Sequence, residues 1–267
     1  MIPNHAMDLV LNGHSIIKVR TVDTDVIILL ISVFHRLESE GLQELWVGFG
    51  KGKHYKDIPI HTVSRELAER KCKVLPLFHS LTGCDYTSYF RSVGKLKFWS
   101  TWENMPELTN ILLEMTENPE QVTIDCPQMS VIQRFVIKTF SLNCETSEVN
   151  EARQRMFTTG LRLFENLPPT KHALLQHTKR SLLAAAFIWK YCLQKSPTIP
   201  NFSAWGWEWH PRLLCWVPYW TDLSDVSKGC SFLGQCGCKV ACTGRCGCHI
   251  GNRRCSSFCK AIGMLNV

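Results

Sequence analysis

The sequence predicts an α/β protein in which a small parallel sheet is followed by a helical region and a small cysteine-rich tail. Strand-like and helical segments alternate over roughly the first 100 residues, as is typical of parallel sheets. From Gly94 onward helical spacing dominates. Eight of the 14 cysteines lie in the last 38 residues, which marks the tail as a part with its own chemistry.

The alternation begins with a helix over 4–12, which ends at Gly13. The β-branched residues Ile16, Ile17, Val19 and Val22 then predict a buried strand. The elements expected next are a helix over 25–37, a strand over 42–49, a short edge strand over 58–61 that Pro59 limits, and helices over 62–71 and 74–81. The last helix leads into a Gly83-Cys84-Asp85 turn.

Helical spacing continues over 95–102, 106–117, 129–140, 147–166 and 171–193, with prolines between several of the segments. Residues 200–220 hold five of the nine tryptophans and lack periodicity. Such a cluster could stack on nucleic-acid bases, but we favour a hydrophobic strap that folds back on the helices. The predicted division is therefore 1–105, 106–200, a Trp-rich connection over 201–229, and a tail over 230–267.

Composition and the pattern of apolar residues indicate where in the cell we expect the protein. The formal net charge is +7 and the hydrophobic fraction is 45%, which is typical of a globular protein and permits a polyanionic partner. The first residues do not resemble a signal peptide, and the longest apolar runs are too short for a membrane span. We expect an intracellular protein, nuclear or cytoplasmic, that is not secreted and has no membrane partner.

Three carboxylates are the candidate site. Asp23 and Asp25 follow the first strand, and Asp85 lies on the Gly-Cys turn about sixty residues later. Together they could bind a hard divalent cation. Alternatively, Asp23 and Asp25 only cap the following helix, and spacing alone favours this second interpretation.

The tail carries cysteines one and three residues apart, a spacing at which thiolates can converge on zinc. The expected zinc ligands are Cys230, Cys236, Cys238, Cys242, Cys246, Cys248, Cys255 and Cys259. Disulfides are the alternative, but they need an oxidising compartment. Six basic residues, among them Arg245, Arg253 and Arg254, make either a phosphate-contacting surface or a solvated charged face.

Three motifs carry a resemblance to a known family: Val22-Asp23-Thr24-Asp25-Val26, the run from Leu75 to Asp85, and Leu174-Leu175-Gln176-His177-Thr178-Lys179-Arg180. They resemble a repetitive, transposon-associated family of animal genomes over nearly the whole chain. Its members join a PIN-like, flap-endonuclease-like domain to a tail similar to the tesmin-type CXC domain.

This resemblance implies metal-dependent hydrolysis of phosphodiester bonds, with Asp23, Asp25 and Asp85 as ligands of Mg²⁺ or Mn²⁺. It also implies that the turn at Gly94 and Lys95 offers backbone amides to a phosphate, of DNA rather than RNA, and that Zn²⁺ occupies the tail.

The chain departs from the family pattern at both ends. The family's earlier acidic pair, Glu-Ala-Asp, lies upstream of the first helix predicted here, and no matching pair precedes Asp23. The CXC pattern has a further cysteine where Ala261 stands. We therefore expect an N-terminally truncated member with weak or absent hydrolysis. The alternatives are a non-catalytic, zinc-dependent DNA-binding module and a gene product without a selected function.

Overall fold

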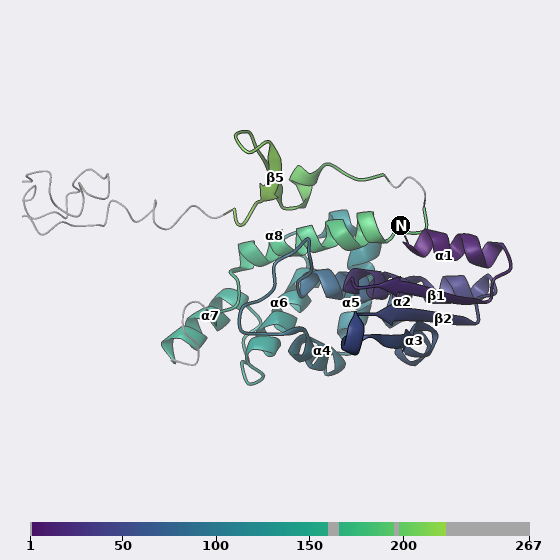
Figure 1. Ribbon diagram of the computed structural model, residues 1–267. Helices are drawn as coiled ribbons and strands as arrows, with labels where there is room; N and C mark the ends of the chain where they lie inside the picture. The colour runs from purple at the N-terminus through teal and green to yellow at the C-terminus, as the bar shows by residue number, and fades with distance from the viewer. Residues whose placement is uncertain (1, 160–165, 195–197, 223–267) are drawn as a thin grey trace, which may run out of the picture. The chain divides into compact units, whose positions relative to one another are not determined.

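The computed structural model (Figure 1) describes residues 2–159, 166–194 and 198–222. The chain divides into two compact units, residues 1–220 and 221–267, and the elements below belong to the first. The eight predicted zinc ligands and the tail residues Arg245, Arg253 and Arg254 lie outside the described residues.

The sheet has three strands in the order β1-β2-β3, namely Ile16–Thr21, Glu44–Phe49 and Lys56–Pro59. Strands β1 and β2 run parallel, with Ile17 opposite Leu45, whereas β3 returns antiparallel to β2. The α/β class is confirmed, while the predicted parallel pairing holds for β1 and β2 only. The prediction that the first strand is buried was wrong. In the described sheet β1 is an edge strand, and Ile16 and Val22 are 61% and 58% exposed.

Three helices accompany this sheet: α1 at Ile2–Leu11, α2 at Thr24–Ser39 and α3 at Ile60–Leu81. Leu30 and Phe34 of α2 are fully buried, together with Leu45 of β2 and Ile60 of α3. The two helices predicted over 62–71 and 74–81 are joined in α3, which is interrupted at Ala68, where φ is +62°. Every residue from Val74 to Leu81 is buried, so the second half of α3 is a central element of the unit.

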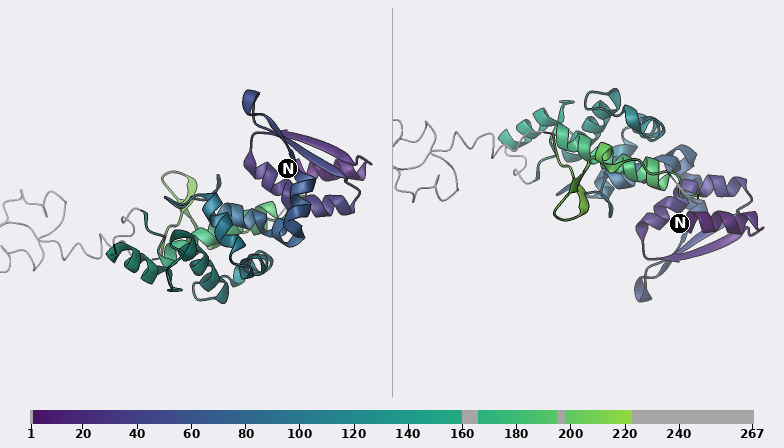
Figure 2. Two further views of the ribbon diagram at one scale, coloured as in Figure 1. Left: turned by 90° about the horizontal axis from the view of Figure 1, so that it is seen from below. Right: turned by 90° about the horizontal axis from the view of Figure 1, so that it is seen from above.

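The helical region follows α3 after the connection over 82–94 (Figures 1 and 2), and most of its bounds are close to those predicted. The helix predicted over 147–166 is shorter as described, and residues 160–165 of that range lie outside the described residues. It comprises α4 at Lys95–Glu103, α5 at Glu107–Glu117, α6 at Pro127–Phe140, α7 at Val149–Thr158, α8 at Lys171–Leu182 and the π-helical continuation η4 at Leu183–Trp189. Short 3-10 turns lie at Gly52–His54 (η1), Pro119–Gln121 (η2) and Phe202–Trp205 (η5).

The sheet and the helical region share one core. Phe78 of α3 stacks on Trp102 of α4, with ring centroids 4.7 Å apart, and the rings of Phe78 and Phe98 lie against that of Phe135 of α6. Most buried apolar residues between Ala6 and Trp205 form one large cluster, and a small second cluster consists of Leu29, Ala184 and Trp189. The predicted segments 1–105 and 106–200 are therefore parts of one compact unit, and so is the connection up to residue 220.

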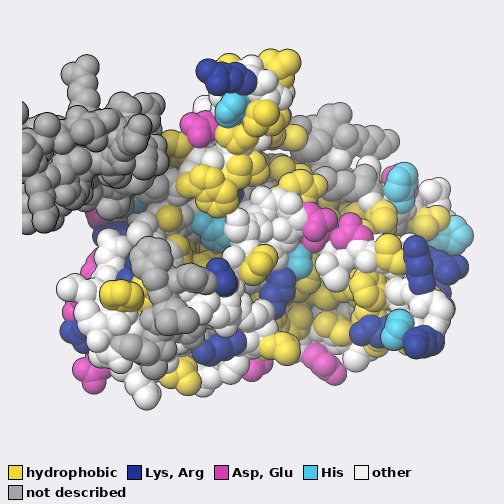
Figure 3. Space-filling view, turned by 60° about the vertical axis from the view of Figure 1, so that its left-hand side comes forward, with side chains coloured by type: hydrophobic (Ala, Val, Ile, Leu, Met, Phe, Trp, Pro, Cys, Tyr) yellow, Lys and Arg dark blue, Asp and Glu magenta, His cyan; other side chains and the backbone are white. Residues whose placement is uncertain are grey.

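The Trp-rich segment folds back on the helices as predicted, but it also forms a hairpin that the sequence did not suggest. Strands β4 (Trp207–His210) and β5 (Cys215–Pro218) pair antiparallel. Trp205 is 5% exposed, and its ring lies 4.6 Å from that of Phe187. In Figure 3 the hairpin stands at the top of the view, with hydrophobic side chains next to charged ones.

Candidate functional site

Asp23 caps helix α2 at the carboxyl end of strand β1. Its Oδ1 accepts a hydrogen bond of 2.8 Å from the backbone N–H of Asp25, and its own N–H donates to Thr21 Oγ1 over 3.0 Å. The helix dipole favours a carboxylate here as well. The capping interpretation is thus confirmed for Asp23, whereas its role as a metal ligand stays a prediction.

Asp25, in the first turn of α2, forms a hydrogen bond with His79, which lies near the C-terminal end of α3. Its Oδ1 lies 2.8 Å from Nε2 of His79, 54 positions later in the chain, and the two side chains are only 14% and 8% exposed. Because a carboxylate accepts hydrogen bonds, Nε2 of His79 carries the proton in this pair. Burial lowers the pKa of His79, and the nearby Lys95 lowers it further, while Asp25 acts in the opposite direction.

Lys95, the first residue of α4, turns its ammonium group inward. Although the residue as a whole is exposed, Nζ donates to the backbone oxygen of His79 and to Thr82 Oγ1, both over 2.9 Å. Desolvation lowers the pKa of Lys95 to about 8, and the charge of Asp25 partly offsets this effect. A cation is therefore held beside the Asp25–His79 pair by two hydrogen bonds to the protein. Gly94 caps the same helix with an extended backbone, φ −90°.

Asp85 occupies a tight turn in which Cys84 and Thr87 exchange backbone hydrogen bonds of 3.1 and 3.2 Å. The hydroxyl of Thr87 donates to Ser80 O, and the sulfur of Cys84 accepts from the N–H of Tyr86 over 3.4 Å. These contacts fix the turn against the end of α3, while the Asp85 side chain is exposed. Cys84 thus serves to shape the turn.

The three carboxylates supply the oxygen donors that Mg²⁺ and Mn²⁺ prefer. Nevertheless, within the described residues no three or more His, Cys, Asp or Glu side chains form a group that could hold a metal ion. Oδ1 of Asp25 is already hydrogen-bonded to His79, and the charge of the Lys95 ammonium acts on this carboxylate through space. The arrangement described here does not fit a two-cation centre.

The motif over 174–180, in helix α8, contacts both the end of α3 and the segment that contains the Trp-rich hairpin. Nε2 of His177, 7% exposed, lies 2.8 Å from Leu81 O, and the hydroxyl of Ser80 donates to Ser181 O over 3.0 Å. Arg180, 3% exposed, donates from Nη1 to Gly206 O and Tyr219 O over 3.0 and 2.7 Å. The resembling motifs at 75–85 and 174–180 are therefore neighbours in space.

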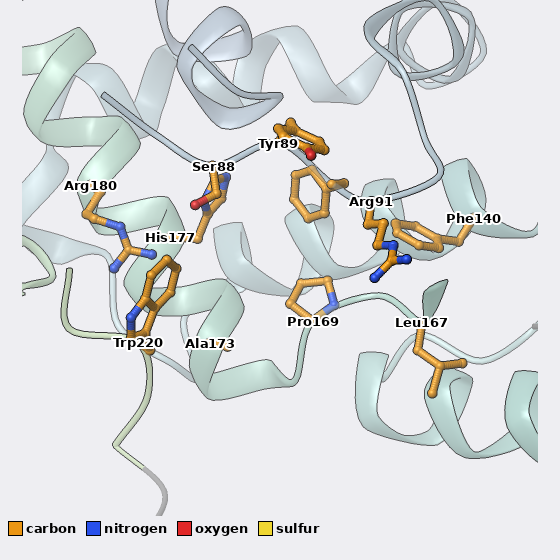
Figure 4. A pocket seen from close by; sticks show the side chains of 11 residues that line it. Ser88, Tyr89, Arg91, Phe140, Leu167, Pro169, Ala173, His177, Arg180 and Trp220 are labelled. Atoms are coloured by element: carbon orange, nitrogen blue, oxygen red, sulfur yellow. The ribbon is translucent and has the colours of Figure 1, made fainter. Parts of the chain in front are cut away.

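A basic and aromatic pocket of about 210 Å³ lies on one side of Arg180. Figure 4 shows Arg180, His177 and Trp220 along one flank of it, with Arg91 and Phe140 along the other. The Arg180 guanidinium lies 5.2 Å from the centre of the Trp220 ring, within the range of a cation–π contact. Arginines interleaved with aromatic rings are typical of surfaces that bind single-stranded nucleic acid.

Three contributors to the site were not assigned from the sequence: the partnership of His79 with Asp25, the inward turn of Lys95 and the buried Arg180. The available signal was polarity in a largely apolar helical run, as at His79, which together with Ser80 interrupts the run from Val74 to Leu81. That signal does not name the partner, since the partner of His79 lies 54 positions away.

Comparison with known proteins identifies no relative. No protein-family model, no curated protein and no solved structure matches the chain. Nor does any helix in the described part of the chain have the length and apolarity that crossing a membrane requires.

Proposed function

We propose that this chain is a mobile-element-derived, PIN-like protein that binds nucleic acid, DNA rather than RNA, and hydrolyses phosphodiester bonds weakly or not at all. The observation that carries the proposal is the state of Asp25. It accepts a hydrogen bond from His79 and lies within the field of the Lys95 ammonium. His79 occupies one oxygen of this carboxylate, and the Lys95 charge opposes the approach of Mg²⁺ or Mn²⁺.

Two observations support nucleic acid as the partner. The pocket beside the buried Arg180 presents the exposed Arg91 near the exposed rings of Tyr89 and Trp220, and the chain as a whole carries a net charge of +7. The basic, cysteine-rich tail adds a second contact surface in this proposal, with Zn²⁺ supplying the folding energy that so short a segment lacks.

Salt dependence tests the binding proposal. The affinity of the full chain for a fluorescently labelled single-stranded oligonucleotide should fall log-linearly as salt is raised, because bound cations are released from the phosphates. Arg91→Ala should weaken binding and reduce the salt slope by about one counterion. Arg36→Ala, which removes an exposed arginine paired with Glu40 on α2, is the matched control. Absence of binding, or an affinity independent of salt, would refute the proposal.

The alternative is that the zinc tail alone binds DNA. Chelation of zinc and deletion of residues 230–267 separate the two cases. If the tail alone binds, either treatment abolishes affinity, and Arg91→Ala has no effect. If deletion leaves the affinity intact, the tail hypothesis fails.

A further inference from the structure

A basic edge lies at the carboxyl ends of strands β1 and β2. It comprises five exposed cations, two on β1 and three on or next to the turn that joins β2 to β3: Lys18, Arg20, Lys51, Lys53 and Lys56. The register of the parallel pair places Arg20 opposite Gly48, near the end of β2, and the N–H of Gly50 donates to Thr21 O over 3.4 Å. The turn therefore lies at the same end of the sheet as Arg20. In the left view of Figure 2 it projects at the top, clear of the helices.

Few negative charges compensate this edge. The strand ends and the turn carry two exposed carboxylates, Asp23 and Asp57. Asp57 is already occupied, because Lys18 Nζ lies 2.8 Å from its Oδ2 and the hydroxyl of Tyr55 donates to its Oδ1 over 2.8 Å. Asp23 caps α2. Within the described residues the other four cations form no ion pair, so the edge keeps an excess of positive charge that a polyanion would neutralise.

An aromatic ring orients the two cations of β1. A Cβ at Gly48 would lie 2.3 Å from the hydroxyl oxygen of Tyr55, so the glycine lets this ring lie across the sheet. Lys18 Nζ and the Arg20 guanidinium lie over the ring, 5.8 and 5.9 Å from its centre, within the range of cation–π contacts. Cations held in this way lose less side-chain entropy when they bind a ligand. This part of the edge is therefore preorganised.

We propose that the basic edge binds the phosphate backbone of the nucleic acid, as a contact separate from the pocket at Arg91. Lys18 and Arg20 lie two residues apart, about 7 Å along the strand, so each reaches a different phosphate of a chain lying across the sheet. Surfaces that bind anionic lipid add several projecting apolar side chains, whereas here Tyr55 lies on the sheet and Val22 alone is exposed between β1 and α2. The inference rests on the proposed function, because it names a second place where the chain holds the same ligand.

The test removes the two turn lysines together, as Lys51→Gln with Lys53→Gln in the full chain, and measures binding of a labelled single-stranded oligonucleotide by fluorescence anisotropy. Two lost phosphate contacts should reduce the slope of log affinity against log salt by about 1.4. The affinity gap between the unaltered chain and the variant should therefore narrow about sevenfold between about 50 and 200 mM salt. Neither lysine has a hydrogen bond or ion pair within the described residues, so the variant should keep the urea unfolding midpoint of the unaltered chain.

Lys73→Gln with Lys138→Gln is the matched control, since it removes two exposed lysines from α3 and α6 and should leave the salt slope unchanged. An unchanged slope in the turn variant, or an equal decrease in the control, would overturn the inference and leave the proposed function standing. So would a turn variant that loses binding to vesicles of phosphatidylcholine and phosphatidylserine but keeps its affinity for DNA, because the edge would then bind lipid. An unaltered chain that binds no oligonucleotide would refute both.

Discussion

Acidification should destabilise the first unit through His177. This imidazole is buried, and burial together with the nearby Arg180 lowers its pKa to about 4, against an ordinary value of 6.5. Between these two pKa values the unfolded chain binds more protons than the folded one, so the free energy of unfolding falls as the pH is lowered through this window. The structural reason is that protonation places a charge in the core, and the hydrogen bond to Leu81 O offsets only part of that cost.

The magnitude follows from the two pKa values. At pH 7 the imidazole is neutral in the folded chain and largely neutral in the unfolded chain, so the linkage penalty is small. At pH 5 the folded chain resists protonation that the unfolded chain accepts, and the loss of stability relative to pH 7 is about 2 kcal/mol. For a unit of this size, 2 kcal/mol corresponds to a decrease in Tm of about 4–8 °C.

The assay is urea unfolding of the full chain, followed by tryptophan fluorescence at pH 7, 6 and 5. His177→Gln is the comparison, because a glutamine amide can donate to Leu81 O and does not titrate. His79, whose pKa is also lowered, titrates in both proteins and cancels in the difference. We expect the stability of the variant to fall about 2 kcal/mol less than that of the unaltered chain. Parallel curves for the two proteins would refute the assignment.

Three further predictions concern the site. Asp23→Ala should lower the free energy of unfolding by about 1 kcal/mol, because α2 loses its N-cap; no change in a urea titration would contradict the cap. Lys95→Met should raise the pKa of His79, measured by NMR titration, because a nearby cation is removed, whereas Lys97→Met should not; equal shifts in the two variants would contradict the placement of the ammonium. Gly83→Ala should destabilise the chain by about 1–3 kcal/mol, because φ is +108° and an added Cβ would lie 2.8 Å from the backbone of the following loop. An unchanged Tm for Gly83→Ala would argue against that turn geometry.

The elements that the sequence predicts well are those whose signal is local. The β-branched run before Asp23 and the apolar spacing of α2, α5 and α6 locate strands and helices within a few residues. The hairpin β4–β5 was missed because each strand has only four residues and the connection lacks an Asn-Gly or Asp-Gly pair. The exposure of β1 was also missed, since β-branched composition indicates a strand but not its position in the sheet.

The candidate site likewise has features that local sequence predicts and features that depend on tertiary packing. The positions of Asp23 and Asp25 at the end of β1 follow from local pattern, and so does the cap. The Asp25–His79 pair could not be predicted, because it depends on how α2 packs against the second half of α3. The inward turn of Lys95 likewise depends on the carbonyl of His79 and the hydroxyl of Thr82, which only the folded chain brings to the start of α4.

The measurement that tests the central claim most directly is a single-turnover incubation of end-labelled single-stranded and flap DNA with excess protein, in Mg²⁺ or Mn²⁺. Native and denaturing gels of the same samples then report binding and cleavage together. The proposed function predicts DNA that is bound and remains intact, or is cut only slowly, with Asp85→Ala changing neither result. Rapid metal-dependent cleavage that Asp85→Ala abolishes would contradict it, and would show that Asp25, despite His79 and Lys95, serves an active metal centre.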